Sequence, residues 1–192
     1  MCGIAAILRQ DRCIEEHEIR AMMEALRHRG PDGEGVWLKE GVALGNRRLA
    51  IIDRATGQQP MGNEDSSVVV SFNGEIYNFR ELRDSLMGKG HTFRTQSDTE
   101  VVVHAYEEWG KQCVEHFRGM FAFCIVDMRK RCLFLARDHF GIKPLVYFQW
   151  GGCFACASEL QALKACEEFP WALNLPALDQ YLWLQYIPAP QT

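Results

Sequence analysis

The second residue of the chain, Cys2, has a side chain that could act as a nucleophile. A free cysteine thiol has a pKa of about 8.5, so only a few per cent of it is ionised near neutral pH and a base is needed. If Met1 is removed, the same residue carries a free α-amine, whose pKa of about 7.7–8.0 leaves part of it neutral. That amine can take the thiol proton, directly or through a water. Taken alone, however, a cysteine here more often simply begins a buried strand.

Asn73 and Gly74 follow an apolar run, 68–72, and could form the oxyanion hole that acyl transfer at a thiol requires. The side-chain amide of Asn73 and the backbone N–H of Gly74 can converge on one oxygen, and the loss of one such donor typically costs about 3 kcal/mol. Asn-Gly is also the strongest short signal for a type I′ hairpin turn. The residues that follow favour a helix over a returning strand, so the sequence leaves both interpretations open.

Two charged residues could orient a substrate beside Cys2. The guanidinium of Arg48 can bind a carboxylate bidentately, and the carboxylate of Asp98 can receive an ammonium group. This pair of charges matches an α-amino acid, although on this evidence alone a surface ion pair is the commoner explanation for each residue. Five histidines offer rival bases for a Cys–His pair, and none has a motif around it: His28, His91, His104, His116 and His139.

Apolar runs of strand length alternate irregularly with amphipathic helical segments, which favours an α+β layered fold with largely antiparallel sheets. Ser97 and Glu100 have the spacing of a capping box before a helix, which places Asp98 in the first turn, near the positive end of the helix dipole. Residues 54–66 have the composition of a loop, and an apolar tail occupies 178–187. The strands are expected over 2–8, 35–38, 42–45, 68–72, 120–127, 132–137, 146–150 and 152–157, and the helices over 15–27, 79–87, 101–109 and 158–165.

Composition narrows the function classes. A net charge of −4 over 192 residues gives no electrostatic case for nucleic acid or an anionic membrane surface. The apolar stretches are too short for a membrane-spanning helix or a signal peptide, so we expect a cytoplasmic protein whose eight cysteines are reduced. Cys153 and Cys156 have the spacing of metal ligands, but residues three apart on a strand face opposite sides, which argues against zinc or redox chemistry there.

Eight short motifs together resemble one family, the glutaminase domain of the glutamine-hydrolysing asparagine synthetases, which are class II glutamine amidotransferases. The resemblance extends over essentially the whole chain. In order, the motifs are Met1-Cys2-Gly3-Ile4, Arg27-His28-Arg29-Gly30-Pro31-Asp32, Arg48-Leu49-Ala50-Ile51-Ile52-Asp53, Phe72-Asn73-Gly74-Glu75-Ile76-Tyr77-Asn78, Ser97-Asp98-Thr99-Glu100, Arg118-Gly119-Met120-Phe121-Ala122-Phe123, Arg137-Asp138 with Gly141 and Lys143-Pro144-Leu145, and Ala157-Ser158-Glu159.

The resemblance implies an N-terminal-nucleophile hydrolase fold, a four-layer αββα sandwich of antiparallel sheets. Cys2 matches the nucleophile, and Asn73 and Gly74 match the oxyanion hole. Arg48 to Ile52, including Leu49, Ala50 and Ile51, match a glutamine-binding strand with Arg48 on the substrate α-carboxylate, while Glu75 and Asp98 match residues around the α-amine. Two departures, Asn46 for a frequent His and Val146 for a frequent aromatic residue, bear on packing or on subfamily.

The resemblance also implies a reaction and its partners. The domain, expected over 1–170, would hydrolyse L-glutamine to glutamate and ammonia without a cofactor or metal of its own. Ammonia would pass to an ATP- and Mg-dependent synthetase domain in a longer chain, most often to make asparagine from aspartate, and 171–192 would begin the linker to it. A homodimer is possible. Two alternatives stay open: a non-catalytic amino-acid-binding or docking domain of this fold, and an amidotransferase for another carboxylate acceptor.

Overall fold

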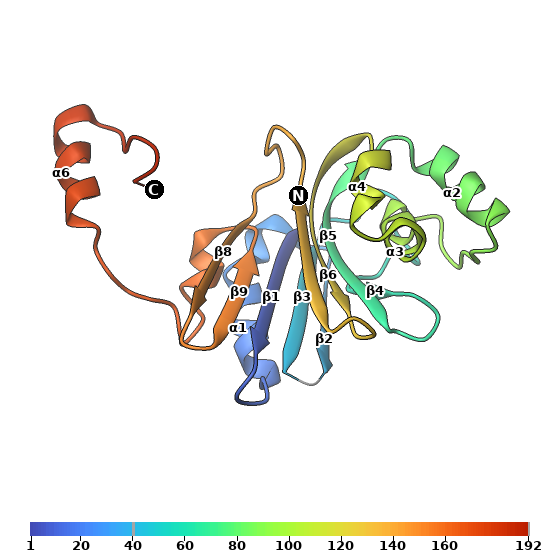
Figure 1. Cartoon of the computed structure of the whole chain (residues 1–192), viewed down its shortest axis with the longest axis horizontal. Coiled ribbons are helices and arrows are strands. Elements are labelled where there is room, and N and C mark those ends of the chain that lie inside the picture. Colours follow the sequence, from blue (N-terminus) through green and yellow to red (C-terminus); the bar gives the residue numbers. More distant parts are fainter. Residues whose placement is uncertain (40, 192) are drawn as a thin grey trace.

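The computed structural model describes residues 1–39 and 41–191, and two antiparallel sheets form its centre (Figure 1). The first sheet has five strands in the order β2-β3-β1-β9-β8. Its middle strand is β1, which pairs antiparallel with both β3 and β9. The strands are β1 (Gly3–Arg9), β2 (Gly33–Lys39), β3 (Val42–Arg48), β8 (Val146–Trp150) and β9 (Cys153–Ala157).

The second sheet has four strands in the order β4-β5-β6-β7, again with every neighbouring pair antiparallel. Its long central pair runs in register from Val68↔Asp127 to Ile76↔Gly119. The strands are β4 (Met61–Gly62), β5 (Val68–Ile76), β6 (Gly119–Asp127) and β7 (Cys132–Arg137). The hairpins predicted around the turns at 128–131 and 151–152 are both present.

Helices cover the outer faces of the two sheets. α1 (Glu16–Glu24) and α5 (Leu160–Leu163) pack on the first sheet, and α2 (Phe79–Gly88) and α3 (Asp98–Trp109) lie on the side of the second. Short helical turns η1 (Arg27–Arg29), η2 (Gly110–Gln112) and α4 (Cys113–His116) complete this part of the chain.

Three buried apolar layers separate the four layers of backbone, because the central strands bury both of their faces. Successive residues of a strand point to opposite sides, so in β1 the side chain of Ile7 packs toward α1 while that of Ala6 packs toward the other sheet. Val69 and Cys124 meet Ala6 in this inter-sheet layer, and Phe123 packs under the helices of the second sheet. The αββα sandwich expected from the sequence is therefore confirmed.

Several local predictions need correction. Asn73 and Gly74 lie inside β5, paired with Ala122 and Phe121, so the hairpin-turn interpretation is wrong. Strand β3 ends at Arg48, so the predicted substrate-binding segment 49–52 is not part of a strand. Within the predicted loop 54–66, β4 forms a short edge strand.

The capping box predicted before α3 is only half formed. The Ser97 hydroxyl accepts a hydrogen bond from the N–H of Thr99, as predicted. The Glu100 carboxylate instead accepts from the N–H groups of Arg94 and Thr95. Glu100 therefore fixes the loop that leads into α3 rather than the cap itself.

The last part of the described chain leaves the sandwich. α6 (Leu175–Leu184) begins at Asn174, whose side chain accepts from the N–H of Ala177, and it stands apart from both sheets (Figure 1). Large apolar side chains on it are exposed, Trp183 to 82%. A domain boundary near residue 170 stays a prediction. Over the described residues, the helices are all too short or too polar to cross a bilayer.

Candidate active site

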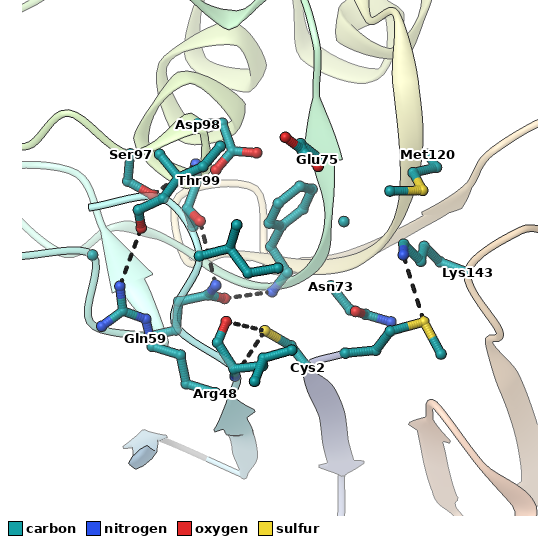
Figure 2. A pocket seen from close by; sticks show the side chains of 17 residues that line it. Cys2, Arg48, Gln59, Asn73, Glu75, Ser97, Asp98, Thr99, Met120 and Lys143 are labelled. Carbon is teal, nitrogen blue, oxygen red and sulfur yellow. Dashed lines mark hydrogen bonds between the residues drawn. The ribbon is translucent and has the colours of Figure 1, made fainter. Parts of the chain in front are cut away.

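A pocket opens at one end of the two sheets, where several of the predicted site residues meet (Figure 2). Cys2 immediately precedes β1, Arg48 ends β3, and Asp98 begins α3. Asn73 and Gly74 lie in the second half of β5. The pocket contains about 570 Å³ of empty space when its open mouth is included.

Cys2 lines the floor of this pocket and is half-buried. Its Sγ accepts a hydrogen bond from the N–H of Leu49 at 3.4 Å, and the thiol can donate to the carbonyl of Leu49 at 3.6 Å. Burial raises the pKa of the Cys2 thiol, and the Leu49 N–H only partly offsets that effect. With Met1 in place the thiol is therefore protonated near neutral pH, so a nucleophilic role needs a base.

The backbone of Cys2 is held from its carbonyl side. The Nε of Arg29 donates to the Cys2 carbonyl at 3.0 Å, and the Nη1 of Arg29 donates to Glu159 at 2.6 Å. Two residues further on, the N–H of Ile4 donates to the Ser158 hydroxyl at 3.0 Å. Two of the sequence motifs, around Arg29 and at Ser158-Glu159, thus meet at the nucleophile candidate.

Asn73 supplies a hydrogen-bond donor that has no acceptor. The residue is 1% exposed, and its Nδ2 is one of the few buried polar side-chain atoms without a partner in the described chain. Leaving a buried donor unpaired typically costs about 1–3 kcal/mol, so such an atom in a pocket points to a ligand. Beside it, a Cβ on Gly74 would lie 2.4 Å from the carbonyl oxygen of Met120, which explains the glycine.

Two carboxylates, Asp98 and Glu75, lie on the opposite side of the pocket from Cys2 (Figure 2). The pKa of Asp98 is raised to about 6, mainly by burial and also by the charge of Glu75, while the hydrogen bond from the Ile76 N–H lowers it. That N–H donates to Asp98 Oδ2 at 3.0 Å. A buried carboxylate beside a second carboxylate is suited to an ammonium group, which would compensate the buried charge of Asp98 and the repulsion between the two.

Arg48 lines the pocket, as expected, and also has a second role. Its guanidinium donates to the carbonyls of Ile52, Asp53 and Arg54 at 3.3, 2.5 and 3.1 Å, so it organises the loop that follows β3. A Cβ on Gly57 would lie 2.6 Å from Arg48 Nη2, which shows how closely the loop wraps the side chain. The loop, rather than a strand, carries the predicted substrate-binding segment.

Within that segment the residues take different positions. Leu49, Ile51 and Ile52 line the pocket. Ala50 is outside the lining, and its N–H donates to the Asp32 carboxylate at 2.9 Å. The Asp32 of the Arg-Gly-Pro-Asp motif therefore positions the loop from the side of β2.

Sequence reasoning missed Gln59, which links the pocket wall to the core. Its Oε1 accepts from the N–H of Phe72 at 2.8 Å and from Asn46 Nδ2 at 3.1 Å, and its Nε2 donates to the Thr99 hydroxyl. Lys143 was also missed: it is 7% exposed, lines the pocket, and its Nζ contacts the Met1 sulfur at 3.5 Å. Gln59 carries no local signal, because it reaches the pocket from a loop, whereas Lys143 belongs to one of the sequence motifs but was given no role in the site.

The rival sites proposed from the sequence are not assembled. The lining of the pocket contains no histidine in the described residues. Cys153 lies beside Cys166 on the α1 side of its sheet, whereas Cys156 packs beside Cys124 between the sheets. The prediction that Cys153 and Cys156 face opposite sides is confirmed, and they cannot share a metal.

Comparison with known proteins identifies the family to which the chain is similar. Residues 1–192 match a family model described as a glutamine amidotransferase domain. The chain is 40% identical over its full length to glutamine-hydrolysing asparagine synthetase 1 of Bacillus subtilis, and 46% identical over 88% of its length to glutamine-hydrolysing asparagine synthetase 2 of Arabidopsis thaliana. It spans only 31% and 30% of the lengths of these two relatives.

Solved structures agree on the fold. The chain superposes on the glutamine phosphoribosylpyrophosphate amidotransferase of Bacillus subtilis with a TM-score of 0.69 at 24% identity, covering 85% of this chain and 43% of that one. A structure of the allosteric regulatory enzyme of purine biosynthesis gives a TM-score of 0.72 at 22% identity, with the same coverage. At these identities the likeness concerns the arrangement of layers alone.

Proposed function

Because the chain belongs to the glutamine amidotransferase domain family, we propose that its pocket hydrolyses L-glutamine through Cys2. The observation that carries this proposal is the convergence, in one pocket, of a thiol, an unpaired Asn73 donor and a desolvated carboxylate, Asp98. These are the groups that amide hydrolysis of an α-amino acid needs. The side-chain amide of glutamine would lie at the thiol, with its ammonium group at the carboxylates.

The proposed reaction begins with the removal of Met1. The freed α-amine of Cys2 takes the thiol proton, and the thiolate attacks the amide carbon of glutamine. Asn73 Nδ2 and the Gly74 N–H stabilise the tetrahedral oxyanion. The C–N bond breaks, ammonia leaves with the proton held by the amine, and a thioester remains. The same amine then activates water, which hydrolyses the thioester to glutamate.

Arg48 contributes to substrate binding in this proposal with the donors it has left. A guanidinium has five N–H groups, and three of them face loop carbonyls. The other two are available for the α-carboxylate of glutamine. Arg48 thus fixes the loop and the substrate together. Glu75 and Asp98 bind the ammonium group at the other end.

The fate of the ammonia is a separate part of the proposal. We propose that it passes to an ATP- and Mg-dependent synthetase domain that amidates aspartate, which the names of the relatives, glutamine-hydrolysing asparagine synthetases, support. The pocket itself needs no cofactor for hydrolysis. The eight free cysteines support a reducing, cytoplasmic environment, and a homodimer stays a prediction for a sedimentation measurement.

The test is glutamate release from glutamine by purified protein whose mass shows that Met1 is absent. Cys2→Ala should abolish the activity and block labelling by a glutamine-like chloroketone. Cys13→Ala, at an exposed cysteine, should change neither. Full activity in Cys2→Ala would refute the mechanism. No hydrolysis and no labelling in the processed wild type would instead favour a non-catalytic amino-acid-binding domain.

The ammonia acceptor needs a separate measurement. A longer protein that carries this domain should form asparagine from aspartate, ATP and glutamine. Amidation of a different carboxylate with aspartate left unused would identify the alternative acceptor class.

A further inference from the structure

A second cluster of reactive side chains lies where the segment between α2 and α3 crosses α3. His91 belongs to that segment, and His104 and Glu107 lie three residues apart on one face of α3. Glu107 Oε2 is 2.9 Å from His104 Nδ1 and 3.9 Å from His91 Nδ1. One nitrogen or oxygen of each of the three residues lies within 4.8 Å of those of the other two. The cluster has no part in the pocket chemistry described above.

The far side of each of these residues has a polar partner. His104 Nε2 lies 3.9 Å from Glu100 Oε1, and His91 Nε2 lies 3.4 Å from Glu108 Oε2. The second oxygen of Glu107 accepts a hydrogen bond from an asparagine amide at 2.7 Å. Histidines that bind a metal through one ring nitrogen typically donate the other to a carboxylate, which fixes the ring and raises its basicity.

We propose that His91, His104 and Glu107 bind one Zn²⁺ ion through the two Nδ1 atoms and one carboxylate oxygen. Tetrahedral zinc with ligands at about 2.0–2.1 Å needs ligand atoms about 3.3 Å apart. The separations of 2.9 and 3.9 Å fall on either side of that distance, so small rotations of the side chains suffice. Two imidazoles and a carboxylate are a set that zinc prefers over Mg²⁺ or Ca²⁺.

Burial around the cluster is graded in a way that suits three protein ligands and one water. The side chain of His104 is 2% exposed, whereas those of Glu107 and His91 are 13% and 17% exposed. The ring of Phe93 packs edge-on against His104, with ring centroids 4.7 Å apart, and shields one side. The partial exposure of His91 and Glu107 gives water access to the fourth position.

The effect of the ion would be to fasten the segment between α2 and α3 onto α3. Ser97, at the end of that segment, lines the active-site pocket, and Asp98 begins the helix. His104 is six residues further along α3, about 9 Å at the helical rise of 1.5 Å per residue. The site would thus stabilise one wall of the pocket without touching the substrate.

The rival explanation is a hydrogen-bonded cluster, in which the two imidazoles sit among carboxylates without any metal. Metal binding distinguishes the two. Protein treated with a chelator and dialysed should bind one equivalent of Zn²⁺ near pH 7.5, with a rise in the thermal unfolding midpoint. His91→Gln, at a partly exposed position, and His104→Gln should each weaken binding at least about 10-fold.

Two control variants locate the ion. His17→Gln, on the exposed face of α1, should leave the zinc affinity unchanged. Cys166→Ser tests the other candidate ligand set, Cys153, Cys166 and Glu168, and should also leave it unchanged. With Co²⁺ in place of zinc, a thiolate charge-transfer band should be absent.

Three results would overturn the proposal: no stoichiometric zinc binding, binding that survives His91→Gln, or binding that is lost in Cys166→Ser. If His104→Gln fails to fold, His91→Gln still decides between the outcomes. Activity toward glutamine is not needed for this test, so its failure is distinct from failure of the proposed function.

Discussion

Replacing Asp98 by Asn should make the protein more stable and the pocket less active. The Asp98 side chain is 4% exposed, and burial raises its pKa from the ordinary 3.8 to about 6. At 1.36 kcal/mol per pH unit, this difference means that the ionised carboxylate lowers the free energy of unfolding by about 3 kcal/mol. The destabilisation is due to the buried negative charge of Asp98, and a bound ammonium group would compensate that charge.

The sign of the effect follows from the folded-state pKa. Because it lies above the unfolded value, the folded state holds the proton more tightly, and stability falls as the pH rises from 3.8 to about 6. Above about pH 6 the full loss of stability is present, and below pH 3.8 there is no loss of stability. Asp98→Asn keeps an oxygen for the N–H of Ile76, but its amide nitrogen cannot accept from Thr99, so we expect a gain of about 2 kcal/mol at pH 7.5.

Urea unfolding of the wild type and Asp98→Asn at pH 7.5 and 4.5 measures this gain, which should shrink to about 1 kcal/mol or less at the lower pH. Asp84→Asn, at an exposed position on α2, should change stability by no more than about 0.5 kcal/mol. In the same samples, kcat/KM for glutamine should fall about 10- to 100-fold in Asp98→Asn. The kcat/KM of the wild type should decline below pH 6, where Asp98 becomes protonated. A variant that is less stable than the wild type at pH 7.5, or a gain independent of pH, would refute the reasoning.

Three further predictions concern the supports of the pocket. Gly74→Ala should destabilise by about 1–3 kcal/mol and abolish glutamine hydrolysis, since its Cβ would meet backbone at 2.4 Å, whereas Gly88→Ala, with open space around it, should be neutral or slightly stabilising in thermal unfolding. Gln59→Leu should lower the free energy of unfolding in urea by about 1–3 kcal/mol, because the buried N–H of Phe72 loses its acceptor while Asn46 Nδ2 keeps Ser71, and Gln58→Leu, at an exposed position, should not. Arg29→Ala should lower kcat for glutamine by at least about 10-fold with a smaller change in KM, and an unchanged kcat would contradict its role in holding Cys2.

The parts of the site that were predictable from sequence are those fixed by local pattern. Cys2 and Asp98 are each defined by their position at the start of an element, a strand or a helix. The alternation of a strand correctly separated Cys153 from Cys156. Such features depend on residues within a few positions of one another, so they are visible without the fold.

The parts that were missed depend on contacts between distant segments. Asn73-Gly74 has a strong local preference for a turn, but pairing along the full length of β6 overrides it. Arg48 was assigned to the substrate α-carboxylate, and the sequence did not reveal that its guanidinium also donates to the carbonyls of the following loop. Gln59 lies 13 residues from Phe72, and nothing in a polar loop sequence reveals that its side chain accepts that backbone N–H.

The contacts around Cys2 separate the placement of the nucleophile from its activation. Arg29 holds the Cys2 carbonyl, and β1 begins at the next residue, so the thiol is positioned by groups on the side away from Met1. Met1 itself lines the pocket, and its sulfur contacts Lys143 Nζ. Removing Met1 would therefore leave the thiol where it is while it clears space in the pocket and converts an amide nitrogen into a base. Processing acts on the chemistry of a site whose shape the fold has already built.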